Sequence, residues 1–125
     1  MQTKILKIDS ADAGKTDMQE AAALIRAGEL VAFPTETVYG LGADALRPEV
    51  SRKIYEAKGR PSDNPLIVHI AEFEDLVSIA REVPRQARLL ADAFWPGPLT
   101  MIVWKNESVP FETTGGLNTV AVRMP

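Results

Sequence analysis

Residues 58–70 read Lys-Gly-Arg-Pro-Ser-Asp-Asn-Pro-Leu-Ile-Val-His-Ile. Two cations, Lys58 and Arg60, flank a glycine and are followed by a turn that two prolines bound. The apolar run that comes next holds His69, the only histidine of the chain. Lysine offers a point charge and arginine a forked donor, and both groups suit a phosphate or a carboxylate. The stretch therefore predicts a strand whose preceding turn binds an anionic ligand.

A second polar loop lies upstream, after the apolar run at residues 30–33. Residues 34–40 read Pro-Thr-Glu-Thr-Val-Tyr-Gly, so hydroxyl groups and a carboxylate crowd a short connection. Turns use hydroxyls routinely, and a hydrogen-bonded turn is the plainer interpretation. Because open α/β sheets bind ligands beyond the ends of their strands, we expect the two polar loops to form two walls of one site.

Helical patterns alternate with short apolar runs along the chain, which is typical of an α/β sheet layered with helices. We expect strands at residues 4–8, 30–33, 66–70, 99–104 and 119–122, and helices at residues 21–25, 48–58, 72–80 and 84–94. Asp17 and Glu20 fit a capping box before the first helix, and residues 9–15 read as a loop. The run at 66–70 is apolar on both faces, so we expect it to be a central strand.

The composition is that of an ordinary globular domain, and it excludes several kinds of site. The chain has 125 residues, of which 46% are hydrophobic and 25% charged, and its formal net charge is -3. This charge gives no general attraction to nucleic acid or to an anionic membrane. The absence of cysteine excludes disulfides and thiolate zinc sites. We expect no metal site on the protein, no membrane partner and a cytoplasmic location, with Mg²⁺ entering alongside a nucleotide.

Each candidate ligand residue also has a plainer interpretation. Lys58 is the cation favoured in the last turn of a helix. Arg60 and Arg123 can be solvated surface cations, and Asn64 is an ordinary turn-former. His69 in an apolar strand is more often a hydrogen-bonded core residue than a ligand. The ligand interpretation instead gives phosphates to Lys58 and Arg60. It gives an adenine edge, a ribose or a phosphate to Asn64 and a carboxylate to Arg123.

Four stretches together carry a resemblance that covers nearly the whole chain. They are Phe-Pro-Thr-Glu-Thr-Val-Tyr-Gly-Leu-Gly at 33–42, Ile-Tyr-Glu-Ala followed by the cationic stretch at 54–70, Phe-Trp-Pro-Gly-Pro-Leu-Thr at 94–100, and Thr-Val-Ala-Val-Arg-Met-Pro at 119–125. In order and spacing they resemble the YrdC/YciO-like family, and within it the threonylcarbamoyl-AMP synthases. The resemblance implies a YrdC-like fold, which is a twisted mixed sheet with flanking helices.

The resemblance also implies a reaction and a set of site residues. Such nucleotidyltransferases form threonylcarbamoyl-AMP and pyrophosphate from L-threonine, bicarbonate and ATP, for the threonylcarbamoyladenosine modification of tRNA. By position in the family motifs, Thr35, His69 and Arg123 correspond to L-threonine contacts, and Arg60, Asn64 and Thr119 to ATP contacts. Lys58 and Arg60 match the Lys-x-Arg motif that holds the phosphates, and are the expected catalytic cations. Partner proteins of the tRNA-modification pathway are also expected.

One departure from the family pattern and one alternative function remain. Family domains continue past the equivalent of Pro125 with a Ser-Ala-Asn segment, so we expect residues 1–125 to form an incomplete YrdC-like domain that is inactive alone. The alternative is an RNA-binding module for double-stranded RNA or ribosomes. The negative net charge and the lack of a stripe of interleaved basic and aromatic residues disfavour this alternative. A related carbamoyl-transfer module would share the same fold.

Overall fold

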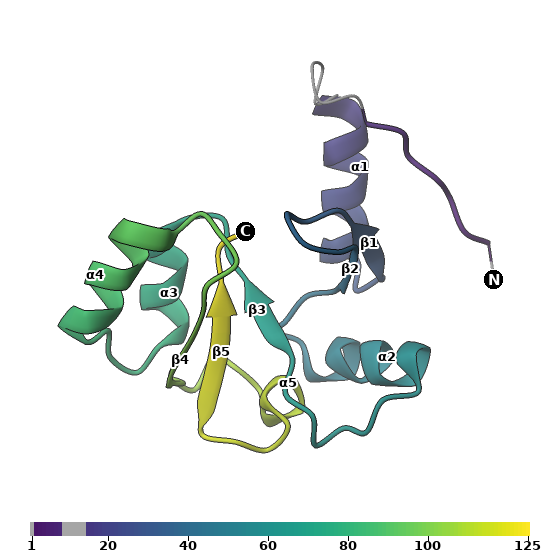
Figure 1. Ribbon diagram of the computed structural model, residues 1–125. Coiled ribbons are helices and arrows are strands. Elements are labelled where there is room, and N and C mark those ends of the chain that lie inside the picture. Colours follow the sequence, from purple (N-terminus) through teal and green to yellow (C-terminus); the bar gives the residue numbers. More distant parts are fainter. Residues whose placement is uncertain (1, 9–14) are drawn as a thin grey trace.

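A computed structural model describes residues 2–8 and 15–125 and has the expected α/β architecture with flanking helices (Figure 1). A three-stranded sheet forms its centre, and a separate two-stranded hairpin lies nearer the N-terminus. The elements are α1 (Lys15–Arg26), β1 (Val31–Phe33), β2 (Gly40–Gly42), α2 (Pro48–Lys58), β3 (Ile67–His69), α3 (Phe73–Ile79), α4 (Arg85–Phe94), β4 (Thr100–Trp104), α5 (Phe111–Thr114) and β5 (Thr119–Arg123). No helix in the described ranges has both the length and the apolar character needed to cross a membrane.

The central sheet is mixed, as predicted, and β5 is its middle strand. β5 pairs in parallel with β3 and antiparallel with β4. The prediction that residues 66–70 form a central strand is wrong, because β3 lies at one edge of the described sheet. Val68 is buried, whereas Ile67 is 41% exposed. The apolar side chain of Ile67 therefore lies on an open surface. The sequence pattern alone does not distinguish an open sheet face from a covered one when both are apolar.

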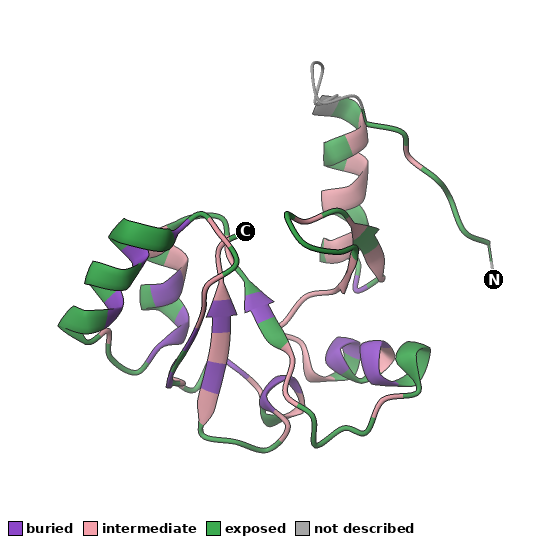
Figure 2. Cartoon of the chain, in the orientation of Figure 1, coloured by how far each residue is buried: buried purple, intermediate pink, exposed green. Residues whose placement is uncertain are grey.

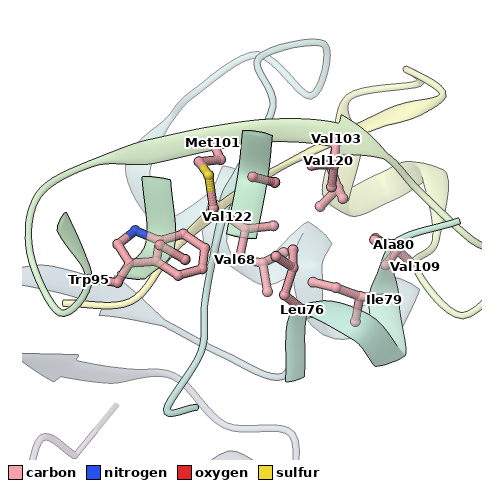
Figure 3. Packing of buried hydrophobic residues seen from close by; sticks show 12 residues of the cluster. Val68, Leu76, Ile79, Ala80, Trp95, Met101, Val103, Val109, Val120 and Val122 are labelled. Carbon is pink, nitrogen blue, oxygen red and sulfur yellow. The ribbon is translucent and has the colours of Figure 1, made fainter. Parts of the chain in front are cut away.

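The main core lies on one face of this sheet, beneath α3 and α4 (Figures 2 and 3). Helix α4 buries only alanines, Ala87 and Ala91, and such small side chains allow a close approach to the strands. Leu76, Val109 and Val122 are fully buried, and burial of each such side chain contributes about 1.5–3 kcal/mol. The buried members of the cluster are Val68, Leu76, Ile79, Ala80, Ala87, Ala91, Trp95, Met101, Val103, Val109, Val120 and Val122.

Helix α2 has the predicted bounds, with Pro48 in its first turn and Gly59 just after its end. Its buried face carries a polar contact to α5, because Ser51 Oγ lies 2.7 Å from Thr113 Oγ1. Thr113 Oγ1 in turn donates to the carbonyl of Ala45 at 2.6 Å, so the serine is the donor of the pair. Buried hydroxyls need such partners, and this chain of hydrogen bonds joins α2 to α5.

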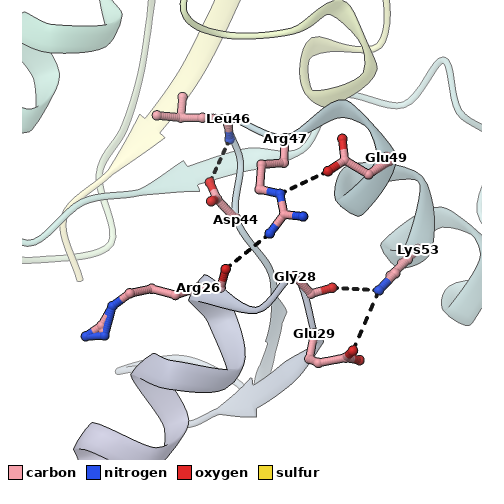
Figure 4. Close-up of polar contacts among 8 residues, drawn as sticks. All are labelled: Arg26, Gly28, Glu29, Asp44, Leu46, Arg47, Glu49 and Lys53. Atoms are coloured by element: carbon pink, nitrogen blue, oxygen red, sulfur yellow. Dashed lines mark hydrogen bonds and ion pairs between the residues drawn. The ribbon is translucent and has the colours of Figure 1, made fainter.

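Two cations at the start of α2 and within it hold the end of α1 (Figure 4). Arg47 Nη1 donates to the carbonyl of Arg26 at 3.1 Å, and Lys53 Nζ donates to the carbonyl of Gly28 at 2.7 Å. The last carbonyls of a helix lack partners within the helix and carry its negative dipole end, so cations are favoured there. These contacts fix the start of the β1–β2 hairpin relative to α2.

Several predicted elements differ from those observed. The predicted strand at residues 4–8 is absent, since Ile5 is 80% exposed and no strand pairs with this segment among the described residues. Helix α1 begins at Lys15, so Asp17 lies inside its first turn and is not an N-cap residue. The predicted loop at 9–15 lies outside the described residues up to position 14. Neither β2 nor α5 was predicted.

Candidate functional site

The second face of the central sheet is open, and it carries three of the predicted ligand residues, His69, Thr119 and Arg123. Side chains alternate along a strand, so Val120 and Val122 of β5 enter the core while Thr119, Ala121 and Arg123 face the other way. On β4 the open face includes Ile102, which is 70% exposed. The open face is thus a partly apolar surface with polar groups at both ends of β5.

His69 and Arg123 are neighbours at one end of this face. Strands β3 and β5 are parallel, and the register pairs His69 directly with Arg123. Adjacent strands lie about 4.8 Å apart, and both residues occur at the carboxyl ends of their strands, where open α/β sheets place ligands. An imidazole and a guanidinium at this position can bind a carboxylate together with a nearby hydroxyl.

Arg123 is held by a threonine on the next strand. Its Nε and Nη2 atoms donate to Thr100 Oγ1 at 3.0 and 2.8 Å, and the register pairs the two residues across β4 and β5. A guanidinium has five N–H donors, so this contact leaves donors for a ligand. Among the described residues, no carboxylate forms an ion pair with Arg123. The guanidinium is therefore oriented without being neutralised.

The β1–β2 loop reaches the same end of the sheet through Phe33. The Phe33 and His69 rings meet edge to face, with centroids 5.7 Å apart and planes at 75°. His69 Nδ1 lies 3.1 Å from the carbonyl oxygen of Ile67 on its own strand. Thr35, two residues beyond Phe33, donates its hydroxyl proton to the carbonyl of Val38 at 2.5 Å. Thr35 thus also has the plainer role of closing its own turn.

The loop that enters β3 lies at the opposite end of the open face. Arg60 Nη2 donates to the carbonyl of Pro65 at 3.1 Å, and the amide of Asn64 donates to the carbonyl of Pro61 at 3.1 Å. Asn64 is therefore a turn-former, as its plainer interpretation holds, and its side chain is exposed. Lys58 is exposed at the end of α2.

This loop is fixed against α5 and Gly115. The amide of Leu66 donates to the carbonyl of Thr113 at 3.0 Å. Gly115 has φ +63, and a Cβ atom there would lie 2.7 Å from the carbonyl oxygen of Asp63. Glycine is required at this position by its backbone conformation and by the close approach of the loop.

The predicted residues thus divide between the two ends of the face. Thr119 and Arg123 lie four residues apart on β5 and point the same way, which separates them by about 13 Å. One group contains Arg123, His69 and the loop of Thr35, and the other contains Thr119 and the loop of Arg60 and Asn64. Two groups at this spacing suit an elongated ligand, or two ligands whose reacting ends meet between them.

A buried tyrosine, Tyr55, lies next to the loop that carries Arg60 and Asp63. Tyr55 is 5% exposed, and its hydroxyl has no hydrogen-bond partner among the described residues. Burial raises the pKa of Tyr55, Arg60 lowers it and Asp63 raises it further. The ring lines a hollow of about 440 Å³ together with Ser62, Asp63 and residues of α5. In the same described ranges, no group of three histidine or acidic side chains could hold a metal ion.

Sequence reasoning missed the residues that support the site. Thr100 contacts Arg123, and Phe33 contacts His69. In each pair the two residues lie on strands that are distant in sequence. Their residue types gave no signal, because a threonine at a strand start and a phenylalanine in an apolar run are ordinary.

Comparison with known proteins gives consistent relatives. The family model Sua5/YciO/YrdC, described as "Telomere recombination", matches residues 23–125. The chain is 64% identical over 105 residues to a threonylcarbamoyl-AMP synthase of Pyrococcus abyssi, covering 84% of this chain and 31% of the relative. It is 51% identical over 129 residues to that of Bacillus subtilis, covering 100% of this chain and 37% of the relative. The chain therefore spans about a third of the length of these curated relatives.

A solved structure gives the same picture. The crystal structure of P. abyssi Sua5 complexed with L-threonine superimposes with a TM-score of 0.86 and 61% identity. The match covers 88% of this chain and 32% of that one.

Proposed function

The chain belongs to the Sua5/YciO/YrdC family, and on this basis we propose that its open sheet face binds the substrates of a threonylcarbamoyl-AMP synthase. The observation that carries the proposal is the direct pairing of His69 with Arg123 at the carboxyl ends of two parallel strands. The second polar group lies about 13 Å away along β5. A small amino acid and a nucleotide would then occupy the two ends.

L-Threonine is assigned to the end that holds Arg123. Its carboxylate would accept a forked pair of hydrogen bonds from the guanidinium, which Thr100 already orients, and such charge-assisted pairs are among the strongest in proteins. His69 and Thr35 would contact the remaining polar groups of the amino acid. Thr35 then exchanges its hydrogen bond to Val38 for one to the ligand, or accepts from the ligand while keeping it.

ATP is assigned to the end that holds Thr119 and the loop entering β3. Lys58 and Arg60 would hold the phosphates, and Asn64 and Thr119 would bind the base, the ribose or a phosphate oxygen. A Mg²⁺ ion would enter with the phosphates, since this ion keeps several waters and needs few protein ligands. We assign it no ligand on the chain.

The proposed reaction needs no protein nucleophile. The amine of L-threonine reacts with bicarbonate to give a carbamate and one molecule of water, and a carbamate oxygen attacks the α-phosphorus of ATP. The bond from the α-phosphorus to the bridging oxygen breaks, and pyrophosphate leaves. The chain would contribute positioning and the stabilisation of developing charge by its cations.

The product is threonylcarbamoyl-AMP, which we propose feeds the modification of tRNA in the cytoplasm together with partner proteins of that pathway. No observation on the described residues favours the alternative of an RNA-binding module. A steep loss of RNA affinity with salt would be its mark.

The test is pyrophosphate release from ATP by the protein at its natural length. Release should require both L-threonine and bicarbonate, and should fall strongly in Arg123→Ala but not in Arg85→Ala, which changes an exposed arginine on α4. Equal release when L-threonine is omitted would refute the proposed substrate.

A further inference from the structure

The ring of Phe33 lies between the β2 strand and His69. The register pairs Phe33 with Gly40 across the hairpin. A Cβ atom added to Gly42 would lie 2.5 Å from Cε1 of the Phe33 ring, and one added to Gly40 would lie 3.2 Å from its Cζ. Because real Cβ atoms do not approach to 2.5 Å, the glycines of the Gly-x-Gly segment provide the space in which this ring lies against β2.

The same ring meets His69 edge to face at 5.7 Å, a geometry that aromatic pairs prefer. Phe33 therefore connects two parts of the chain that belong to different sheets, the β1–β2 hairpin and β3. The loop of Thr35 starts directly after β1, so the ring lies where this loop leaves the hairpin and faces His69.

Phe33 is not a member of the main core. The buried cluster lies on the other face of the central sheet and does not include it, and the Phe33 side chain is only half-buried. Phe33 instead lies between two parts of one end of the site, the hairpin that carries the Thr35 loop and the strand that carries His69.

We infer that Phe33 is a positioning residue for L-threonine binding, which acts by holding His69 and the Thr35 loop together over the space provided by Gly40 and Gly42. This inference rests on the proposed function, because it takes L-threonine as the ligand of that end. Phe33 itself need not touch the ligand. Its loss should weaken L-threonine binding and leave ATP binding at the far end unchanged.

Two variants test the inference in different ways. Phe33→Leu keeps an apolar side chain but removes the ring, and Gly42→Ala keeps the ring but displaces it. Phe94→Leu is the matched control, since Phe94 is exposed on α4 outside the site. Calorimetry would give the dissociation constants for L-threonine and ATP. NMR would follow the His69 ring signal, identified by its loss in His69→Gln.

Both variants should shift the His69 ring signal more than the control does, because the ring current of Phe33 moves away. Both should raise the dissociation constant for L-threonine by about threefold to tenfold, the range expected from the loss of one aromatic pair. ATP binding should stay within about twofold of the unchanged protein, which also reports that the fold is intact.

An unchanged chemical shift of the His69 ring in Phe33→Leu would contradict the contact between the Phe33 and His69 rings. A shifted signal with unchanged L-threonine affinity would overturn the positioning role. If the unchanged protein bound no L-threonine, the proposed function would fail, and the inference with it. If the unchanged protein bound L-threonine and both variants did so equally well, only the inference would fail.

Discussion

Arg123 shows how a neighbouring side chain can orient a residue that is proposed to bind a ligand. A free arginine side chain loses rotamer freedom when it binds a ligand, and the two hydrogen bonds to Thr100 restrict it beforehand. Pre-organisation of this kind improves affinity by reducing the cost of ordering. The contribution of Thr100 can be measured separately from that of Arg123.

Thr100→Val removes the acceptor and leaves a side chain of similar shape. We expect L-threonine binding to weaken by about 1 kcal/mol, the typical cost of ordering one long side chain on binding, with ATP binding unchanged. Calorimetry on the protein at its natural length gives both numbers, and Thr16→Val, at an exposed position on α1, is the control. Unchanged L-threonine affinity would show that Arg123 needs no support from Thr100.

Lys58 and Arg60 should differ in what their removal does. Lys58→Ala should weaken ATP binding by about 1–3 kcal/mol, as expected for hydrogen bonds to charged groups, without loss of stability. Arg60→Ala should weaken ATP binding at least as much, because it also frees the carbonyl of Pro65 and loosens the loop. ATP titrations beside thermal unfolding separate the two effects. If ATP bound to both variants as tightly as to Arg85→Ala, neither Lys58 nor Arg60 would contact ATP.

At the residue scale, the sequence offered polar candidates, of which the strand register pairs His69 with Arg123, but it did not indicate what supports them. Lys58, Arg60 and His69 stand out because their loop has an unusual density of charge and turn residues. Phe33 and Thr100 do not stand out, since contacts between distant strands leave no local pattern. The ligand roles themselves stay predictions.

At the scale of elements, α2 was predicted with its full bounds because its start and stop signals are local. Pro48 suits the first turn of a helix, and Gly59 ends it. The β2 strand and α5 have three and four residues, too few for a periodic pattern. They form because the chain around them is already fixed, β2 by its pairing with β1 and α5 by the contact of Thr113 with Ser51.

Because of Tyr55, the free energy of unfolding of the protein should decrease at alkaline pH. Burial raises the pKa of Tyr55, so above about pH 10, the ordinary value, the unfolded chain loses this proton before the folded protein does. The unfolded state then binds fewer protons, and stability falls as pH rises. Tyr55→Phe should remove that part of the loss.

The same variant tests the unpartnered hydroxyl. At neutral pH, Tyr55→Phe should raise the free energy of unfolding by about 1 kcal/mol, because burying a hydroxyl without a partner is costly. Denaturant unfolding at neutral and alkaline pH gives both results, with Tyr39→Phe, at an 80% exposed position, as the control. A loss of stability at neutral pH would mean that the hydroxyl has a partner, such as a bound water.

Gly115→Ala should displace the loop that enters β3, at the end of the face where we propose that ATP binds. The positive φ and the carbonyl of Asp63 at 2.7 Å from the added Cβ together predict a loss of about 1–3 kcal/mol in stability and a displaced loop. ATP binding should weaken while L-threonine binding is retained, as long as the variant is folded at the assay temperature. Wild-type stability in thermal unfolding would contradict the observed approach of the loop.

At the scale of the whole molecule, the alternation of helical and apolar patterns was sufficient to predict an α/β sheet with flanking helices. It was not sufficient to say which face of the sheet is covered. Ile67 and Ile102 are apolar and line the open face. The apolar second face of residues 66–70 led to the wrong placement of β3 in the middle of the sheet. The division of the candidate site into two ends follows from the parallel pairing of β3 with β5. The sequence alone does not predict which strands pair.

The central claim is that one sheet face binds L-threonine at one end and ATP at the other, and paired calorimetry tests it most directly. Arg123→Ala should lose L-threonine affinity by about tenfold or more with ATP affinity nearly unchanged. Asn64→Ala should weaken ATP binding and leave L-threonine binding intact, and Arg85→Ala should change neither. If Arg123→Ala and Asn64→Ala, both folded, weakened the two ligands equally or affected neither, the two-ended site would be wrong.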